Sequence, residues 1–290
     1  MENRKITVAS SPHIKSNLRV NRIMLDVIIA LVPVAAAGIY FNGIKGLILI
    51  AVTVLGSMGT EVVFKRLLHK KHSLNDLSAV VTGLILALIL PVDTPLWVAL
   101  LSSIFAISLV KEIFGGLGQN FMNPAAAAKI FAVVSYGNIV VNKGFEGISI
   151  QERLVGSAGG NLGEASIIAI LVGGIYLAVK GIIRARVPFM VLLVSFVFSA
   201  VVLGDITILA GNSSIYLVAF FLANDYASSS ITNPGKWIYA AFVGLGASLF
   251  IGLSKNIEGA YYAVLIGNVF APFIDSFFEG KVDTKKGATA

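Results

Sequence analysis

The sequence predicts an all-α polytopic membrane protein with about ten transmembrane helices, arranged as two inverted repeats of five. Three observations lead to this fold class. Of the 290 residues, 57% are hydrophobic and only 13% are charged, whereas about a quarter of the residues of a soluble domain are charged. The mean hydropathy is +0.88. Apolar runs recur along the chain, and Lys and Arg residues cluster in alternate connections between these runs.

Ten apolar stretches are long enough, or nearly long enough, to span a bilayer. A straight transmembrane helix needs about 20 residues. Three short stretches lie beside clusters of Gly, Pro or Asn, so we expect them to be helices that irregular backbone interrupts or completes. The ten stretches are 23–40, 44–64, 77–90, 96–113, 124–134, 165–183, 187–203, 215–222, 237–253 and 260–274.

The basic residues indicate the orientation of the chain. Cytoplasmic connections carry an excess of Lys and Arg, so the pattern predicts a cell-membrane protein with both termini in the cytoplasm. The basic residues are spread over several connections rather than gathered in one patch, which argues against nucleic acid as a partner. The predicted parts are a cytoplasmic N-terminal segment (1–22), a first membrane repeat (23–134), an outward-facing loop (135–164), a second membrane repeat (165–275) and a cytoplasmic tail (276–290).

Two pairs of similar sequence segments favour the division into repeats. The segment 86–105 has the same layout as 218–244: a broken apolar run, a polar turn, then Trp and a second apolar run. The motif NFMNPA at 120–125 resembles NVFAPF at 268–273. A repeat of five spans reverses its direction in the membrane, and transporters built in this way bind their ligands near the midplane between the repeats.

The segment 114–129, FGGLGQNFMNPAAAAK, is the main polar interruption of the first predicted repeat. Its glycines permit irregular backbone, and Pro124 can begin a helix because its missing N–H would be unpaired there. Irregular backbone at membrane depth requires cover from protein or a polar cavity, so this break predicts a ligand or ion site. The candidate residues are Gly115, Gly116, Gly118, Asn120 and Asn123.

Lys129 is the least expected charge, because it follows Pro124 by little more than one helical turn in an apolar helix. Such a group either faces a cavity or partner or extends to the membrane interface. The glycine-rich turn GSAGGNLGE also has two interpretations. It is either a flexible cap of the next span or a cradle of backbone amides for an anionic or ring-edge ligand, with Gly160 and Glu164 as candidates.

Asp225 lies among small hydroxyl residues in LANDYASSSITNP. A carboxylate with serine and carbonyl oxygens suits a sodium ion, and the same carboxylate can equally cap a helix. Asp76 is interpreted as a cap, and Glu112 is expected at the membrane interface. The three histidines are too scattered for a metal site, and the absence of cysteine excludes thiolate-bound clusters on this chain.

Several motifs together resemble the D subunit of the Rnf-type ion-translocating ferredoxin:NAD oxidoreductase, which is similar to the B subunit of the sodium-pumping NADH:quinone reductase. The motifs are SSPHIKS, NDLSAVVTGLILALILP, KEIFGGLGQNFMNPA, GGNLGEAS and NVFAPFID, between Ser11 and Asp275. The resemblance implies a urea-channel-like fold. It also implies a subunit, not catalytic alone, of a complex that couples electron transfer between ferredoxin and NAD to sodium or proton movement. Other membrane subunits and iron–sulfur subunits would be its partners.

The resemblance also implies an FMN that is joined to a threonine before the GGNLGE turn. This chain has no threonine from Pro95 to Ile206, so no attachment residue can be assigned. Either a flavin, FMN or riboflavin, is bound without a covalent link, or a partner supplies it. A non-covalent flavin is expected in an apolar slot between the Gly115–Asn123 break, Lys129 and the turn of Gly160 and Glu164. The missing threonine leaves two alternatives open, a solute channel or transporter without redox function and a purely structural subunit.

Overall fold

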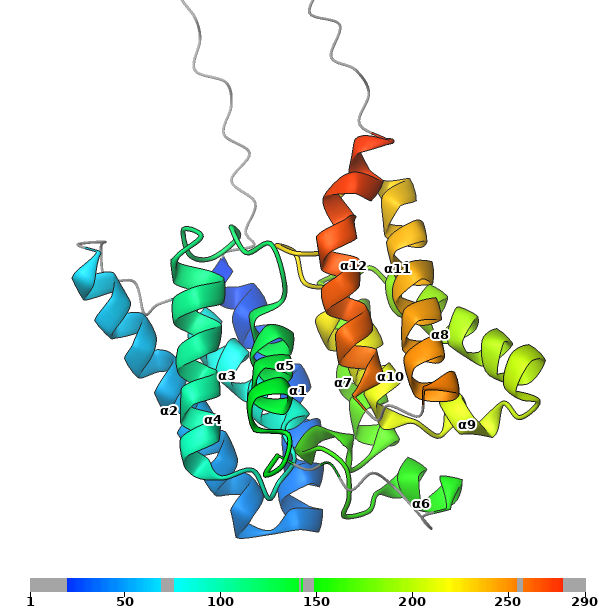
Figure 1. The fold of residues 1–290 in the computed structure, drawn as a ribbon, viewed down its shortest axis with the longest axis horizontal. Helices are drawn as coiled ribbons and strands as arrows, with labels where there is room; N and C mark the ends of the chain where they lie inside the picture. Colours follow the sequence, from blue (N-terminus) through cyan, green and yellow to red (C-terminus); the bar gives the residue numbers. More distant parts are fainter. Residues whose placement is uncertain (1–19, 69–75, 141, 143–148, 255–257, 279–290) are drawn as a thin grey trace, which may run out of the picture.

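The structure is a computed structural model that describes residues 20–68, 76–140, 142, 149–254 and 258–278. Within these ranges the chain forms helices and one isolated bridge between Pro91 and Asn161, without a β-strand (Figure 1). This confirms the all-helical class. The SSPHIKS motif, the three histidines and most of the two predicted terminal segments lie outside the described residues.

Each of the ten predicted stretches coincides with a helix. Four of these helices continue as a π-helix, and the remaining three helical segments of the described chain are short pieces in the connections. The ten are α1 (Val20–Asn42), α2 (Ile44–Leu67), α3 (Ser78–Ile89), α4 (Leu96–Phe105) with η2 (Ala106–Glu112), α5 (Pro124–Tyr136), α7 (Ile167–Val179), α8 (Arg186–Phe198) with η4 (Ser199–Leu203), α10 (Ser213–Leu217) with η5 (Val218–Leu222), α11 (Asn233–Ser248) with η6 (Leu249–Leu253), and α12 (Gly259–Ser276). The short pieces are α6 (Ile150–Val155), η3 (Leu162–Glu164) and α9 (Thr207–Ala210).

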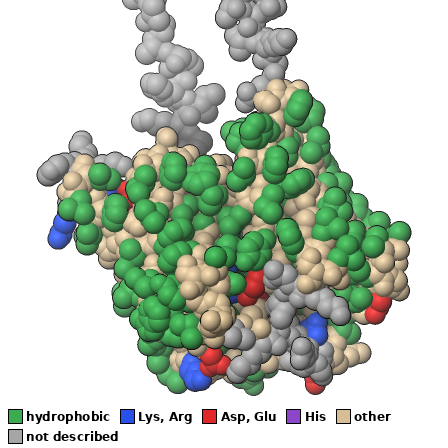
Figure 2. Space-filling view, in the orientation of Figure 1, with side chains coloured by type: hydrophobic (Ala, Val, Ile, Leu, Met, Phe, Trp, Pro, Cys, Tyr) green, Lys and Arg blue, Asp and Glu red, His purple; other side chains and the backbone are tan. Residues whose placement is uncertain are grey.

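Four helical segments of the described chain are long and apolar enough to cross a membrane alone, namely 20–42, 44–67, 186–203 and 233–253. Shorter apolar helices include α3, α5, α7 and α10 with η5. In Figure 2, hydrophobic side chains are spread over the visible outer surface of the helices and few charged side chains appear there, as expected for a surface that faces lipid. The protein is therefore a polytopic membrane protein, while the number of ten spans stays a prediction.

The predicted break before α5 is present. Gly115, Gly116 and Gly118 have φ angles of 123°, 101° and 84°, which residues with a Cβ rarely adopt. The helix then begins at Pro124, and the Asn123 side chain caps it by accepting a hydrogen bond from the Ala126 amide. The sequence therefore predicted both the break and the first residue of the helix.

The two predicted halves meet where α1 packs on α7 and where α5 packs on α12 (Figure 1). Within the halves, α2 packs on α4 and α8 packs on α11, which are equivalent pairs under the predicted repeat. The two proline motifs, however, occupy different positions within their helices. Pro124 is the first residue of α5, whereas Pro272 lies inside α12. The inverted repeat stays a prediction, and this motif pair does not support it.

Gly173 allows α1 and α7 to approach closely. A methyl group at this position would overlap the Ala30 carbonyl oxygen, whereas one at Gly59 in α2 would meet nothing within 4 Å. We expect Gly173→Ala to lower the free energy of unfolding by about 1–3 kcal/mol, because a packed interface must move apart. Gly59→Ala, the matched control, removes a helix glycine without a clash and leaves stability unchanged or raised. Thermal unfolding of both variants in detergent checks this, and equal effects would contradict it.

Candidate functional site

Lys129 lies in the second turn of α5 and is 0% exposed. Its Nζ is 2.9 Å from Oδ1 of Asn161 and 2.8 Å from Oε1 of Glu258, and it lies 5.8 Å from the centroid of the Tyr261 ring. The lysine therefore pairs inside the protein and does not extend to the interface. With Glu164 these residues form a buried group that we call the Lys129 cluster: Lys129, Asn161, Glu164, Glu258 and Tyr261.

The glycine-rich turn contributes Asn161 and Glu164 to this cluster. The Glu164 carboxylate accepts hydrogen bonds from the Asn161 amide at 3.1 Å, from Nδ2 of Asn161 at 2.8 Å and from the Tyr261 hydroxyl at 2.6 Å. The next amide, that of Leu162, donates to the Leu90 carbonyl oxygen just beyond α3. Gly160 has a φ of 63°, so it allows the sharp turn that directs the following residues inward.

Glu164 lies in the connection between α5 and α7 rather than in a spanning helix. Burial raises the pKa of its carboxyl group, and the neighbouring Glu258 carboxylate raises this pKa further. Asn161 stands between the two acids, because its Nδ2 also lies 3.5 Å from Oε2 of Glu258. The cluster thus joins α5, the turn before α7 and the beginning of α12 around one ammonium and two carboxyl groups.

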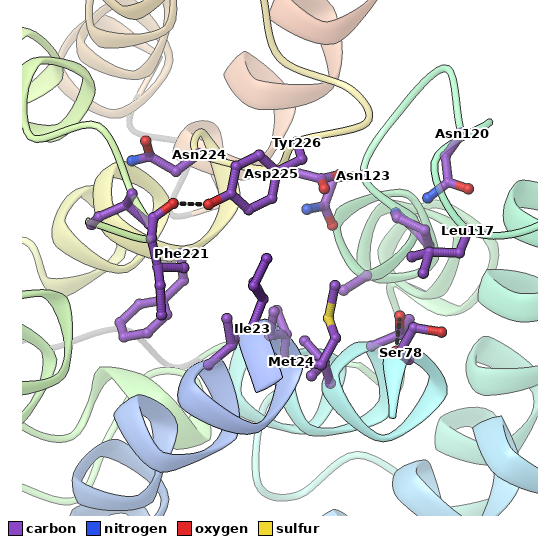
Figure 3. Close-up of a pocket in the computed structure, with 18 of the residues that line it drawn as sticks. Ile23, Met24, Ser78, Leu117, Asn120, Asn123, Phe221, Asn224, Asp225 and Tyr226 are labelled. Carbon is purple, nitrogen blue, oxygen red and sulfur yellow. Dashed lines mark hydrogen bonds between the residues drawn. The ribbon is translucent and has the colours of Figure 1, made fainter. Parts of the chain in front are cut away.

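A second site is a cavity of about 100 Å³ next to the N-terminus of α5 (Figure 3), which we call the inner cavity. Apolar side chains form most of its wall, and many of them come from α1, α3, α7 and η5. The Asn120 side chain lines it, is 7% exposed, and its Oδ1 makes no hydrogen bond with the described residues. The polar lining residues are Ser78, Thr82, Lys111, Asn120, Asn123, Asn224, Asp225 and Tyr226.

Among the described residues that line the inner cavity, Asp225 is the only one with a carboxylate. It lies in the irregular turn after η5, where its Oδ2 accepts a hydrogen bond from the Ser228 hydroxyl at 2.7 Å. This contact caps a turn and not a helix, so the helix-cap interpretation is not met. The ion interpretation stays a prediction, and the carboxylate does belong to the cavity lining.

Asn268 of α12 ties the two halves together beside this cavity. Its Oδ1 accepts a hydrogen bond from the Asn123 amide at 3.0 Å. Its Nδ2 donates to the Ser228 carbonyl oxygen at 3.1 Å and to the Tyr239 hydroxyl at 2.8 Å. One amide side chain thus fixes the start of α5 relative to the turn that carries Asp225.

The sequence did not indicate a third buried group, on α2, η2 and the start of α3. Lys111 Nζ lies 3.0 Å from Oε1 of Glu61 and 2.5 Å from the Ser78 hydroxyl, and Lys65 lies 2.9 Å from Glu61. The i,i+4 spacing of Glu61 and Lys65 in an apolar helix was the available signal. Asp76 accepts hydrogen bonds from the backbone and hydroxyl of Ser78, as expected for a cap.

Two further acidic residues, Glu112 and Asp275, are buried in the structure. Glu112 is 2% exposed, so it is buried within the protein, and its position at the depth of the membrane interface stays a prediction. It is covered because the glycine break folds back over it, and a methyl group at Gly116 would lie 3.7 Å from Oε1 of Glu112. Asp275, which the sequence did not single out, accepts hydrogen bonds from Ser230 and Thr232 before α11.

The residues that were expected to form one flavin slot are divided between two sites. Asn120 and Asn123 line the inner cavity, whereas Lys129 and Glu164 belong to the Lys129 cluster. Pockets that enclose cofactor-sized ligands have volumes of roughly 300–1,000 Å³, and the inner cavity of about 100 Å³ is smaller. The described residues therefore do not form the expected single slot, and a flavin on this chain stays a prediction.

Helices with an apolar outer surface surround buried ion pairs and a mainly apolar cavity with several polar lining residues. This arrangement defines a polytopic membrane protein with ionisable groups buried between its helices. The chain belongs to the NQR2, RnfD, RnfE family, whose model matches residues 7–283.

Three relatives illustrate this membership. The chain is 38% identical to the D subunit of the Na(+)-translocating ferredoxin:NAD(+) oxidoreductase complex of Acetobacterium woodii, over 97% of this chain and 96% of the relative. It is 32% identical to the D subunit of the ion-translocating oxidoreductase complex of Methanosarcina acetivorans, over 93% and 94%. It is 28% identical to the D subunit of the proton-translocating ferredoxin:NAD(+) oxidoreductase complex of Clostridium ljungdahlii, over 93% and 94%. The resemblance that the motifs indicated is thereby confirmed.

Proposed function

We propose that this chain is a membrane subunit of an Rnf-type complex that couples electron transfer between ferredoxin and NAD to translocation of sodium ions or protons. The observation that carries the proposal is the match with D-subunit relatives along nearly the full length of both chains. The chain has no cysteine, so iron–sulfur clusters would come from partner subunits. Its own part would be a membrane scaffold and a segment of the ion path, with both termini in the cytoplasm.

The inner cavity supports the ion path. Asp225 supplies a negative charge, and amide side chains from both halves supply oxygen ligands, which suit a hard cation. Asn120 adds a buried carbonyl oxygen that no described residue satisfies. A cavity of about 100 Å³ has room for several waters or a partly hydrated ion. Two relatives carry sodium and proton translocation in their names, so the ion itself is a matter for measurement.

Purification through a tag on this chain tests the proposal. We expect cluster-binding subunits to copurify, and we expect the preparation in sealed vesicles to take up ions when reduced ferredoxin and NAD are supplied. Membranes from a strain that lacks the chain should lose the coupled ion movement. Isolation of the chain alone, together with unchanged coupled activity in the deletion strain, would favour a solute channel or transporter instead.

Any flavin associated with this chain is proposed to be non-covalent and to lie where the chain meets a partner subunit. The absence of a threonine from Pro95 to Ile206 and the small inner cavity support this placement. In a denaturing gel of the purified complex, we expect no flavin fluorescence at the position of this chain. We also expect that denaturation of the complex releases its flavin, which then passes through a filter that retains protein. A fluorescent band at this chain would contradict the prediction.

A further inference from the structure

The Lys129 cluster contains more negative than positive groups. Lys129, Glu164 and Glu258 are 0%, 1% and 6% exposed. Glu258 pairs with the Lys129 ammonium, so an ionised Glu164 would have no ion-pair partner among the described residues. An uncompensated buried charge is costly, and buried groups usually avoid this cost by taking up or releasing a proton.

Contacts within the cluster distinguish the two acids. Glu258 lies 2.8 Å from the Lys129 ammonium, which compensates its charge. Glu164 is contacted by the Asn161 amide groups and the Tyr261 hydroxyl, and no Lys or Arg of the described residues forms an ion pair with it. The distance of 2.6 Å between Oε1 of Glu164 and the Tyr261 oxygen is typical of a strong hydrogen bond between oxygens.

Leu88 of α3 and Leu217 of α10 pack beside Gly163, the residue before Glu164. Among the described residues, the ionisable groups that contact Glu164 or its partner Asn161 are Lys129 from α5, and Glu258 and Tyr261 from the beginning of α12.

Lys129 lies four residues after Ala125, which lines the inner cavity. Four residues correspond to about 6 Å along a helix axis. The cluster is therefore the next polar group beyond the cavity along α5.

We propose that the Glu164–Tyr261 pair binds one exchangeable proton and so serves as a proton-binding site beyond the inner cavity. The proton is taken up by Oε1 of Glu164, the Tyr261 hydroxyl changes from donor to acceptor, and the carboxyl group becomes neutral. Release of the proton restores the buried carboxylate. The inference rests on the proposed function for its role in ion movement, but the site itself is a property of this chain alone.

Infrared spectroscopy of the purified full chain in detergent tests the site without partners. A protonated buried carboxyl group has a distinct C=O stretching band, and we expect such a band to titrate as the pH is raised from acidic to alkaline values. The band should be absent in Glu164→Gln. Glu152→Gln, which changes an exposed acid in the same connection, is the matched control and should retain the band.

A second variant keeps Glu164 in place and separates proton binding from a purely structural role. In Glu258→Gln the neighbouring negative charge is lost, so the titration midpoint should fall by about one pH unit or more. A band that persists in Glu164→Gln, or a midpoint that Glu258→Gln does not lower, would overturn the proposal. Loss of the band on adding NaCl but not KCl would also overturn it, since sodium would then be the ligand.

The infrared test uses the isolated chain, so its result does not depend on assembly of the complex. Failure of the proposed function would appear as loss of copurification or of coupled ion uptake, whereas failure of this inference appears in the spectrum of the isolated chain.

Discussion

Lys129→Met is expected to lower the free energy of unfolding by about 3–5 kcal/mol, because it leaves the Glu258 carboxylate buried without its ammonium partner. The pair lies 2.8 Å apart, and the two side chains are 0% and 8% exposed. Water cannot replace the lost ammonium as it would at a surface. Denaturant unfolding of the purified chain in detergent measures the effect.

The chain provides a matched control for this prediction. Lys45 and Asp93 are also 2.8 Å apart, but their side chains are 69% and 52% exposed. Lys45→Met should therefore cost no more than about 1 kcal/mol. In the double variant of Lys129→Met with Glu258→Gln, both charges are removed and much of the lost stability should return. Similar losses for Lys129→Met and Lys45→Met would contradict the role given to burial.

Asp225→Asn is expected to reduce ion translocation by the complex by about tenfold or more, while electron transfer from ferredoxin to NAD continues. A tenfold loss corresponds to about 1.4 kcal/mol in a barrier. Asp225 is the only carboxylate among the described residues that line the inner cavity, and asparagine retains an oxygen that accepts the hydrogen bond from Ser228. The change therefore removes the charge and preserves the turn. Ion uptake and NAD reduction by the same vesicles measure the two activities.

Ser228→Ala is the control for the Asp225 prediction. It removes the hydroxyl that donates to Asp225 but keeps the carboxylate, so ion uptake should stay close to that of the unchanged complex. If Ser228→Ala and Asp225→Asn reduce uptake equally, Asp225 acts through the turn rather than through its charge. Full ion uptake by a stable Asp225→Asn complex would remove Asp225 from the proposed path.

Local sequence determined where the helices lie. Burial of apolar side chains and backbone hydrogen bonding within a helix involve residues a few positions apart, so the ten apolar stretches correspond to ten helices. The beginning of α5 was equally local, because Asn123 caps the helix and Pro124 begins it. The glycines before Asn123 indicated the break, and the positive φ angles of Gly115 and Gly116 confirm it.

Local sequence patterns did not predict which residues pair with the buried charged side chains. Lys129 was predicted to meet a cavity or a partner, but Glu258 is 129 positions away in the chain. Lys111 and Glu61, 50 positions apart, were not connected at all. The residues of the expected flavin slot are divided for the same reason, because the glycine break and the glycine-rich turn each have the expected local form but face different sites.

The sequence by itself determined the membrane class, the helix positions, the break before α5 and the family resemblance. Only the tertiary structure decided which buried charges neutralise one another and which polar residues share a cavity. The physical reason is that a buried lysine or glutamate must find an opposite charge or a hydrogen-bond partner wherever packing brings one close. Packing between α5, the turn before α7 and α12 depends on the shapes of whole helices rather than on any short motif.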